Sequence, residues 1–291
     1  MPQTNLTRAL STHAFVEHRL TTVWLDRVWQ AGIPLVEIFC ARQHLDYRNR
    51  AQVAELGYWF RDSELKLHSV HAPIYNDEVW GRSGPEAVID ITEPVKSKRM
   101  KMVDEIKRAL EISETSPFRY FIQHLGTKNT EFNDRSVDAA FSSLEEIVLF
   151  ARQRGVEVLI ENTPNELSSA ERLLMFFELT HLNLNVCFDL GHAHMHEGIE
   201  NAYRLLQSRI RSIHVHDNNG KEDQHLYPLL AQDGTTVGTI DWVRAMELLR
   251  SRTNQYPLLL ELKEVPEMGS PVEAARRIFD RLEELKVPDE L

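Results

Sequence analysis

Apolar runs of strand length recur along the chain, each rich in Val, Ile, Leu and Phe. In order they read "RALSTHAF", "PLVEIFC", "LKLHSVHAP", "RYFIQHLG", "VEVLIENTP", "LNVCFDLGH", "RSIHVHDN" and "PLLLELKE". Between them, segments such as residues 16–32, 95–113, 136–155 and 271–286 carry apolar residues at helical spacing. Continuous apolar strands that alternate with helices predict a parallel sheet covered by helices. Eight such units in 291 residues predict a (β/α)8 TIM barrel.

Loop lengths add to this picture. We see no linker, low-complexity tract or shift in composition, so we expect residues 1–291 to form a single domain. Two segments are longer than barrel loops need to be: residues 75–95 after the third expected strand and residues 217–240 after the seventh. Long loops in a compact domain are usually functional or disordered. Because both follow strands, both should lie at the face where TIM barrels build active sites.

Composition narrows the class of protein. The hydrophobic content of 42% suits a sizeable core, and the two cysteines, Cys40 and Cys187, are too few for a disulfide framework. The start "MPQTNLTRAL" lacks the pattern of a signal peptide, and we see no apolar run long enough to span a membrane. We therefore expect a cytoplasmic protein. A net charge of −11 disfavours nucleic acid as a partner.

Polar residues end one apolar strand after another. They are His71, His124, Glu161, Asp189, His192, His214, His216 and Glu261. A buried strand has no packing reason to end in a carboxylate or an imidazole, because an unpaired buried charge is costly. Convergence on a cation would remove that cost. The set therefore predicts a metal site at one end of the barrel.

Four successive strands supply Glu161, Asp189, a histidine and Glu261. Adjacent strands lie about 4.8 Å apart, so these side chains can meet around one ion. Carboxylates with an imidazole suit Mn²⁺, Mg²⁺, Co²⁺ or Zn²⁺. Strand alternation puts His214 and His216 on the same face, so periodicity alone does not choose between them.

The motifs together resemble the xylose isomerase-like superfamily of TIM barrels, which includes sugar isomerases and epimerases, inosose dehydratases and the endonuclease IV family (AP endonuclease family 2). The resemblance rests on "HAP", "HLG", "IENT", "FDLGH", "HVHDN" followed by "DQH", and a Glu that closes the eighth strand. It covers nearly the whole chain. It implies that His214 is the ligand, because the family's histidine stands three residues before an aspartate, here Asp217.

The isomerase branch implies one divalent ion on Glu161, Asp189, His214 and Glu261. The endonuclease branch implies three zinc ions, and its further ligands match His71, His124, His192, Asp223 and His225. Mn²⁺ or Zn²⁺ is the expected cofactor, with Mg²⁺ or Co²⁺ as alternatives.

The primary hypothesis is a metal-dependent isomerase or epimerase that moves a proton on a small keto sugar or polyol-derived substrate through an enediolate. Glu161, Glu261 and His192 are the expected catalytic residues. The residues expected to bind substrate are His124, His216, Lys263 and Trp80, the last from the 75–95 loop. The sequence leaves the sugar, its phosphorylation and the oligomeric state open, a homo-oligomer included.

The alternative is a three-zinc phosphodiesterase of the endonuclease IV type, and an inosose dehydratase-like lyase is a further variant. Two departures weaken the endonuclease alternative. The segment "TVGTIDW" lacks the acid that many relatives carry between two glycines, and "HLG" stands where the nuclease has "HPG". The segment "HAPIYNDEVWGRSG" also lacks a basic cluster for DNA. A barrel that only binds a ligand is the third hypothesis.

Overall fold

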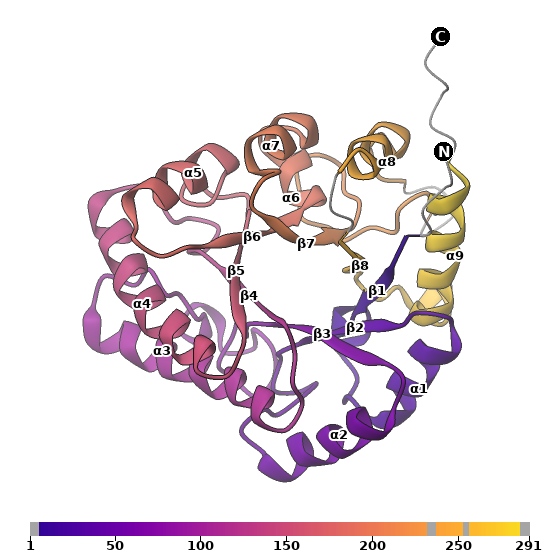
Figure 1. Cartoon of the computed structure of the whole chain (residues 1–291), viewed down its shortest axis with the longest axis horizontal. Coiled ribbons are helices and arrows are strands. Elements are labelled where there is room, and N and C mark those ends of the chain that lie inside the picture. The colour runs from indigo at the N-terminus through magenta and orange to yellow at the C-terminus, as the bar shows by residue number, and fades with distance from the viewer. Residues whose placement is uncertain (1–5, 232–236, 253–255, 286–291) are drawn as a thin grey trace.

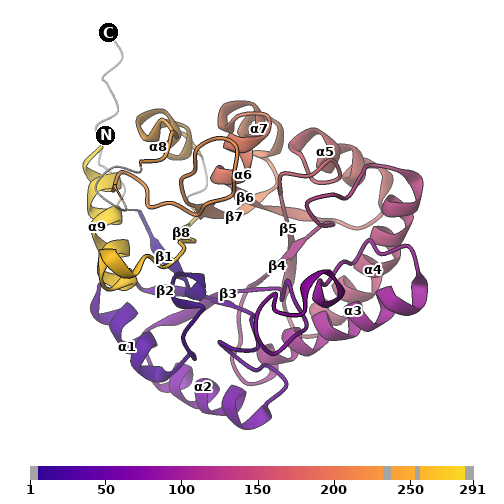
Figure 2. The same ribbon diagram turned by 180° about the vertical axis from the view of Figure 1, so that it is seen from behind.

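A computed structural model describes residues 6–231, 237–252 and 256–285. Eight parallel strands close into a barrel in chain order, and β8 pairs with β1. The strands are β1 (Arg8–Ser11), β2 (Leu35–Phe39), β3 (Lys66–His71), β4 (Tyr120–His124), β5 (Glu157–Glu161), β6 (Asn185–Asp189), β7 (Ile210–Val215) and β8 (Leu258–Leu260). Figures 1 and 2 show these strands from two opposite sides, with helices around them. The predicted TIM barrel is confirmed.

Nine α-helices are found in the described part of the chain. They are α1 (Thr22–Gln30), α2 (Arg50–Asp62), α3 (Lys96–Leu110), α4 (Asp134–Arg152), α5 (Ala170–Leu179), α6 (Leu190–Met195), α7 (Ile199–Leu206), α8 (Trp242–Arg250) and α9 (Pro271–Glu284). Polar side chains start several of them: Asn133 accepts a hydrogen bond from the backbone of α4, and Asp241 does so for α8. Such caps satisfy backbone N–H groups that have no partner within the helix. None of the described helices is long and apolar enough to cross a membrane.

The first predicted helix starts later than its spacing indicates. Residues 16–32 were expected to be helical, but α1 begins at Thr22 and a 3-10 helix covers Thr12–Phe15. The backbone N–H of Leu20 donates to the carbonyl of His44, at 2.8 Å. Because this bond joins the segment to the loop after β2, residues 16–21 do not continue the helix.

Strand alternation sorts side chains into an outer and an inner set. Outward residues such as Val158 and Ile160 pack with the helices in the main core. The barrel interior has a small apolar cluster of its own: Tyr120, Ile122, Leu159 and Cys187. The next inward positions, two residues further along β4, β5 and β6, are His124, Glu161 and Asp189. The polar residues therefore lie above an apolar floor inside the barrel.

The two long loops fold back over the barrel end. In the 75–95 loop, a bridge between Tyr75 and Val88 brings the two limbs together. In the 217–240 loop, Asp217 forms a similar bridge with Leu226. A side chain at Gly238 would overlap the Asp217 carboxyl group, with its Cβ 1.9 Å from Cγ. The glycine in "TVGTIDW" thus makes room for Asp217, while residues 232–236 of this loop lie outside the described part.

Candidate metal centre

Four predicted ligands meet at the ends of β5 to β8, and we call them the carboxylate cluster: Glu161, Asp189, His214 and Glu261. One ligand atom of each lies within 4.8 Å of the others. His214 Nδ1 is 3.3 Å from Glu161 Oε1 and 3.4 Å from Glu261 Oε2. All four side chains are buried, and Asp189 Oδ2 has no hydrogen-bond partner in the described part of the chain. A divalent cation fits this donor set and would satisfy that buried oxygen.

The other side of His214 is held by Glu37, a residue that the sequence analysis missed. Its Oε2 atom lies 3.2 Å from His214 Nε2 and accepts a hydrogen bond of 2.8 Å from Ser69 Oγ. Glu37 comes from β2 and is fully buried. A carboxylate that accepts a hydrogen bond from one ring nitrogen fixes the tautomer of the imidazole. The lone pair of the other ring nitrogen is then free for a metal. Glu37 thus directs Nδ1 of His214 into the carboxylate cluster.

Glu161 also belongs to a second group, the His71 cluster, which consists of His71, His124 and Glu161. Its Oε2 atom lies 3.3 Å from His71 Nε2 and 3.1 Å from His124 Nε2. The Nδ1 atom of His71 is 2.8 Å from the carbonyl of Ala72. Because one carboxylate faces both groups, Glu161 is placed to bridge two ions.

The third group is the imidazole cluster: His192, His216, Asp223 and His225. Asp223 lies at its centre, with Oδ2 3.2 Å from His192 Nε2 and Oδ1 3.3 Å from His225 Nε2. His192 comes from α6, and Asp223 and His225 come from the loop after β7. The structure therefore brings all nine residues of the larger predicted ligand set into three adjoining groups. It adds His216, which was expected to contact substrate.

The charges of the histidines and the carboxylates in these groups shift one another's pKa values. Burial alone would lower the pKa of His192, but Asp189, Asp223 and Glu161 raise it well above its ordinary value. Burial would also lower the pKa of His225, but the nearby carboxylates of Asp223 and Glu261 raise it to about 9. Burial would raise the pKa of Glu161, yet the imidazoles, His214 foremost, hold it well below its usual range. Protons on His192 and His225 therefore balance the nearby carboxylates, and a metal must displace these protons to bind.

An inner cavity of about 370 Å³ adjoins the clusters. Glu261 lines it, together with Trp80 from the 75–95 loop and Lys263 after β8. The Trp80 ring lies 5.3 Å from the Phe39 ring, and its Nε1 atom has no hydrogen-bond partner in the described part of the chain. The structure thus places Trp80 and Lys263 at the site, whereas His216 is fully buried and is not among the residues that line this cavity.

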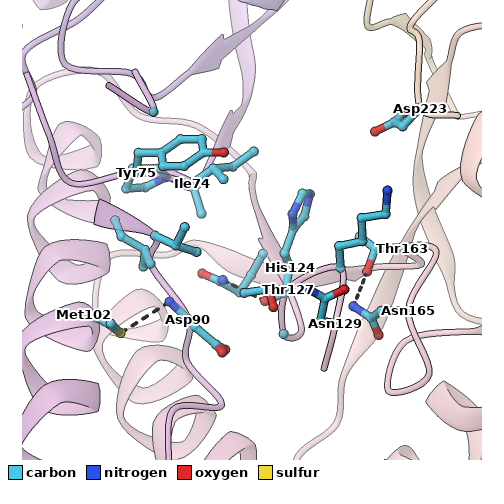
Figure 3. Close-up of a pocket in the computed structure, with 18 of the residues that line it drawn as sticks. Ile74, Tyr75, Asp90, Met102, His124, Thr127, Asn129, Thr163, Asn165 and Asp223 are labelled. Carbon is cyan, nitrogen blue, oxygen red and sulfur yellow. Dashed lines mark hydrogen bonds between the residues drawn. The ribbon is translucent and has the colours of Figure 1, made fainter. Parts of the chain in front are cut away.

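An outer cavity of about 710 Å³ continues from the inner one, and His71, His124, His192 and Asp223 line both. Figure 3 shows the outer cavity, with Asp223 on one side and Tyr75 and Met102 on the other. The loops after β3, β4 and β5 form its walls. The space next to the predicted metal ligands is therefore large enough for a sugar with substituents.

Comparison with known proteins agrees with this geometry. Residues 25–285 match the model of one family, the xylose isomerase-like TIM barrel. The chain belongs to this family. Among curated relatives, "Uncharacterized protein MJ1311" of Methanocaldococcus jannaschii is 30% identical over 122 residues, which cover 39% of each chain. "Uncharacterized protein y4fM" of Sinorhizobium fredii is 25% identical over 259 residues, which cover 81% of this chain and 78% of the relative.

Solved structures extend the likeness of fold to almost the whole chain. A D-tagatose 3-epimerase-like protein has a TM-score of 0.73 at 23% identity, covering 96% of this chain and 99% of its own. A D-psicose 3-epimerase has the same TM-score at 13% identity, covering 97% and 100%. The IOLI protein, solved with a zinc atom, has a TM-score of 0.71 at 14% identity, covering 95% and 96%. These three proteins are similar to this chain in fold.

Proposed function

We propose that this protein is a divalent-metal-dependent isomerase or epimerase that acts on a small keto sugar or polyol-derived substrate. The carboxylate cluster carries the proposal, because its four buried donors adjoin a sugar-sized cavity and leave one carboxylate oxygen without a partner. Mn²⁺ or Zn²⁺ is the proposed ion, held by Glu161, Asp189, His214 and Glu261. The names of the structural neighbours, an epimerase and an epimerase-like protein, agree with this reaction class.

A bound ion would supply positive charge beside the substrate oxygens when a proton leaves carbon. Glu161 and Glu261 then flank that carbon, and the carboxylate that takes the proton from carbon becomes the acid that returns it. Their low pKa values keep both ionised at neutral pH, as a proton acceptor requires. Glu261 lines the inner cavity and has direct access to a substrate there.

The other walls of the inner cavity suit a sugar. The apolar face of a sugar ring packs against aromatic side chains, and Trp80 and Phe39 supply such a surface. The unpaired Nε1–H of Trp80 offers a donor to a hydroxyl group, and His124, which also lines this cavity, offers a further polar atom. Lys263 also lines the inner cavity. We propose that it contacts a further hydroxyl group of the sugar.

Charge around the cavities favours an uncharged substrate. The lining of the outer cavity includes one lysine, Lys128, and three acids, Asp90, Glu93 and Asp223. Lys263 in the inner cavity likewise has Glu264 and Glu261 among its neighbours. A phosphate group is typically bound by clustered arginines and lysines or by backbone N–H groups, and each cavity has only one lysine and no arginine among its described lining residues. We therefore propose an unphosphorylated keto sugar.

Solvent deuterium incorporation tests the reaction. Metal-loaded protein is incubated in deuterated water with a panel of keto sugars, and nuclear magnetic resonance detects deuterium at the carbons beside the carbonyl group. We expect exchange in at least one sugar, lost in Glu261→Gln and retained in Glu157→Gln, a control on β5 outside the clusters. If metal-loaded protein catalyses fast isomerisation without any deuterium uptake, proton transfer through carboxylates that exchange their proton with solvent is wrong.

The second candidate is a three-zinc phosphodiesterase. It is favoured by the three adjoining clusters, which together contain every ligand that the endonuclease resemblance implies. Incision of abasic DNA by the zinc-loaded protein tests it directly. A rate far above a Glu161→Gln control would replace the sugar proposal, because Glu161 belongs to two of the three clusters.

A further inference from the structure

The imidazole cluster contains a donor that the family resemblance does not assign, His216. Its ring is fully buried at the end of β7, and its Nε2 atom has no hydrogen-bond partner in the described part of the chain. This atom lies 3.8 Å from Asp223 Oδ1 and 3.1 Å from Asp189 Oδ1. A buried ring nitrogen that faces two carboxylates at poor hydrogen-bond geometry is an unsatisfied polar atom aimed into the cluster.

The chain makes room for this ring with a glycine. A Cβ atom at Gly191, on α6, would lie 2.1 Å from His216 Cε1. Any side chain there would displace the imidazole. The ring also stacks on His225, with centroids 4.1 Å apart and planes 18° apart. Gly191 and His225 thus hold the His216 ring in one position from two sides.

Backbone carbonyl groups orient all three histidines of the cluster in the same sense. Nδ1 of His192 lies 3.0 Å from the carbonyl of Asn162, and Nδ1 of His225 lies 2.9 Å from that of Glu261. Nδ1 of His216 lies 3.4 Å from the carbonyl of Asp217. An imidazole that donates from Nδ1 presents a lone pair at Nε2. The three Nε2 atoms therefore all face Asp223, where a metal that displaces the protons on them finds three nitrogen donors.

The backbone at His225 is also unusual. Its φ angle is +49°, in the left-handed region that residues other than glycine rarely adopt. Such a conformation persists only where the surroundings determine it, and it often marks a ligand site. Here it turns the His225 ring back to Asp223, so that the loop after β7 delivers two donors to the cluster.

We propose that His216 is the fourth ligand of a zinc site formed with His192, Asp223 and His225. Three imidazoles and one carboxylate suit zinc in tetrahedral geometry, in which bonds of about 2.0–2.1 Å place donor atoms about 3.3 Å apart. The four donor atoms already lie within 4.8 Å of one another, so small side-chain movements close the site. This zinc is distinct from the ion of the carboxylate cluster and goes beyond the proposed reaction.

With four protein ligands, the zinc ion would stabilise the structure and would not take part in catalysis. A zinc ion with four protein donors has no open position for water or substrate, in contrast to catalytic zinc. The ion would fasten the loop after β7 to α6 and to the end of β7, and so fix one wall of both cavities. It would also occupy the Nε2 atom of His192, which leaves proton transfer to Glu161 and Glu261. A three-zinc phosphodiesterase needs its third ion to reach a phosphate, so a closed site argues against that reaction.

The Glu161→Gln variant isolates this site, because Glu161 belongs to both other clusters and not to this one. In that background, zinc competition with a chromophoric chelator measures affinity, and visible absorption after cobalt substitution reports coordination number. We expect one tightly bound ion per chain with the strong absorption of four-coordinate cobalt. Adding His216→Asn should weaken zinc binding by at least about tenfold, the loss that even outer-shell changes cause.

Two further variants separate ligand loss from damage to the fold. Gly191→Ala keeps the histidine but displaces its ring, and should weaken zinc binding and the cobalt spectrum in the same direction. His194→Asn is the matched control, because His194 lies nearby and bonds to Thr239 Oγ1 at 2.8 Å without joining the cluster. Circular dichroism confirms that each variant is folded.

The proposal is overturned if the Glu161→Gln protein binds no zinc. It is also overturned if His216→Asn leaves both the zinc affinity and the cobalt spectrum unchanged. Neither result bears on the proposed sugar reaction, because the titration uses no sugar and the carboxylate cluster shares no ligand with this site.

Discussion

The carboxylate cluster and the imidazole cluster lie side by side but are built in different ways. All four ligands of the carboxylate cluster stand at the ends of neighbouring strands, and Glu37 on β2 supports its histidine. The imidazole cluster takes one ligand from α6, one from the residue after β7, and two from a loop. Its central residue, Asp223, is 38% exposed, whereas the four carboxylate-cluster side chains are at most 3% exposed.

This difference suggests two roles at one end of the barrel: the carboxylate cluster would hold an ion beside a substrate, and the imidazole cluster would anchor a loop. Strand ends are rigid, so ligands there can hold an ion and a substrate in fixed geometry. Loops need an anchor, and a zinc ion provides one. We therefore expect changes in the carboxylate cluster to act on chemistry and changes in the imidazole cluster to act on the order of the loop.

The largest effect should come from Glu161→Gln. We expect it to reduce deuterium exchange into the substrate by about 10²–10⁴-fold, because it removes both a proton-transfer group and a metal ligand. Glu157→Gln on the same strand should change the rate little, since Glu157 bonds to Asn185 away from the clusters. Exchange rates followed by nuclear magnetic resonance test this. Equal rates in the two variants would break the assignment of chemistry to the carboxylate cluster.

Glu37→Gln should weaken metal binding in the carboxylate cluster by about 10–100-fold, as the loss of a carboxylate that orients a metal-binding histidine does. The amide is a poorer acceptor for His214 Nε2–H than the carboxylate, so the ring loses its fixed tautomer. Metal affinity by competitive titration gives the first measurement. The ¹⁵N chemical shifts of His214 give the second, and a purely structural role for Glu37 would leave them unchanged.

The pH dependence of metal binding should separate the two clusters. Neighbouring carboxylates raise the pKa of His225 to about 9 and that of His192 well above its ordinary value, so both rings hold protons at neutral pH. Zinc needs free nitrogens, so affinity falls as pH drops below these pKa values, by about tenfold per pH unit for each proton released. The carboxylate cluster has one such ring, His214. Titrations at pH 6, 7 and 8 should show the steeper slope for the imidazole cluster.

The variants that isolate each cluster are Glu161→Gln for the imidazole cluster and the double variant His71→Asn, His225→Asn for the carboxylate cluster. Parallel slopes in the two proteins would contradict the different proton release that we infer.

Metal removal should have the smallest effect of the four changes. The effect should be confined to the loop after β7 and leave the barrel as it is. With a chelator present, amide hydrogen exchange in residues 217–231 should speed up by about tenfold, because the loop then opens more often. Peptides from β2 should exchange as before. Exchange mass spectrometry measures both regions in one experiment, and uniform acceleration along the chain would show that the ions support the whole fold.

Much of the fold follows from patterns that act locally. Apolar runs and helical spacing predicted the barrel, because buried parallel strands and amphipathic helices each leave a periodic signal. The same periodicity placed Glu161 and Asp189 at strand ends. It failed at residues 16–21, where a backbone bond from Leu20 to His44 overrides helical spacing. Such a contact joins segments far apart in the sequence and leaves no periodic trace.

In the candidate site, too, the sequence motifs predict single residues but not the contacts between residues that lie far apart in the sequence. Glu37 stands alone in "PLVEIFC", and its partner His214 lies 177 positions away. Alternation put His214 and His216 on one face but could not tell that one ring meets Glu37 and the other meets Asp223. The glycine that admits His216 also looks ordinary in "FDLGH", since only the fold shows what packs against it.

The central claim is that Glu161 holds metal at the barrel end. The most direct test is the metal content of protein purified without a metal-affinity tag, measured by inductively coupled plasma mass spectrometry beside Glu161→Gln. We predict that the wild-type protein holds at least one more divalent ion per chain than the variant. Equal metal content in two folded proteins would contradict the claim and remove the basis for the proposed reaction.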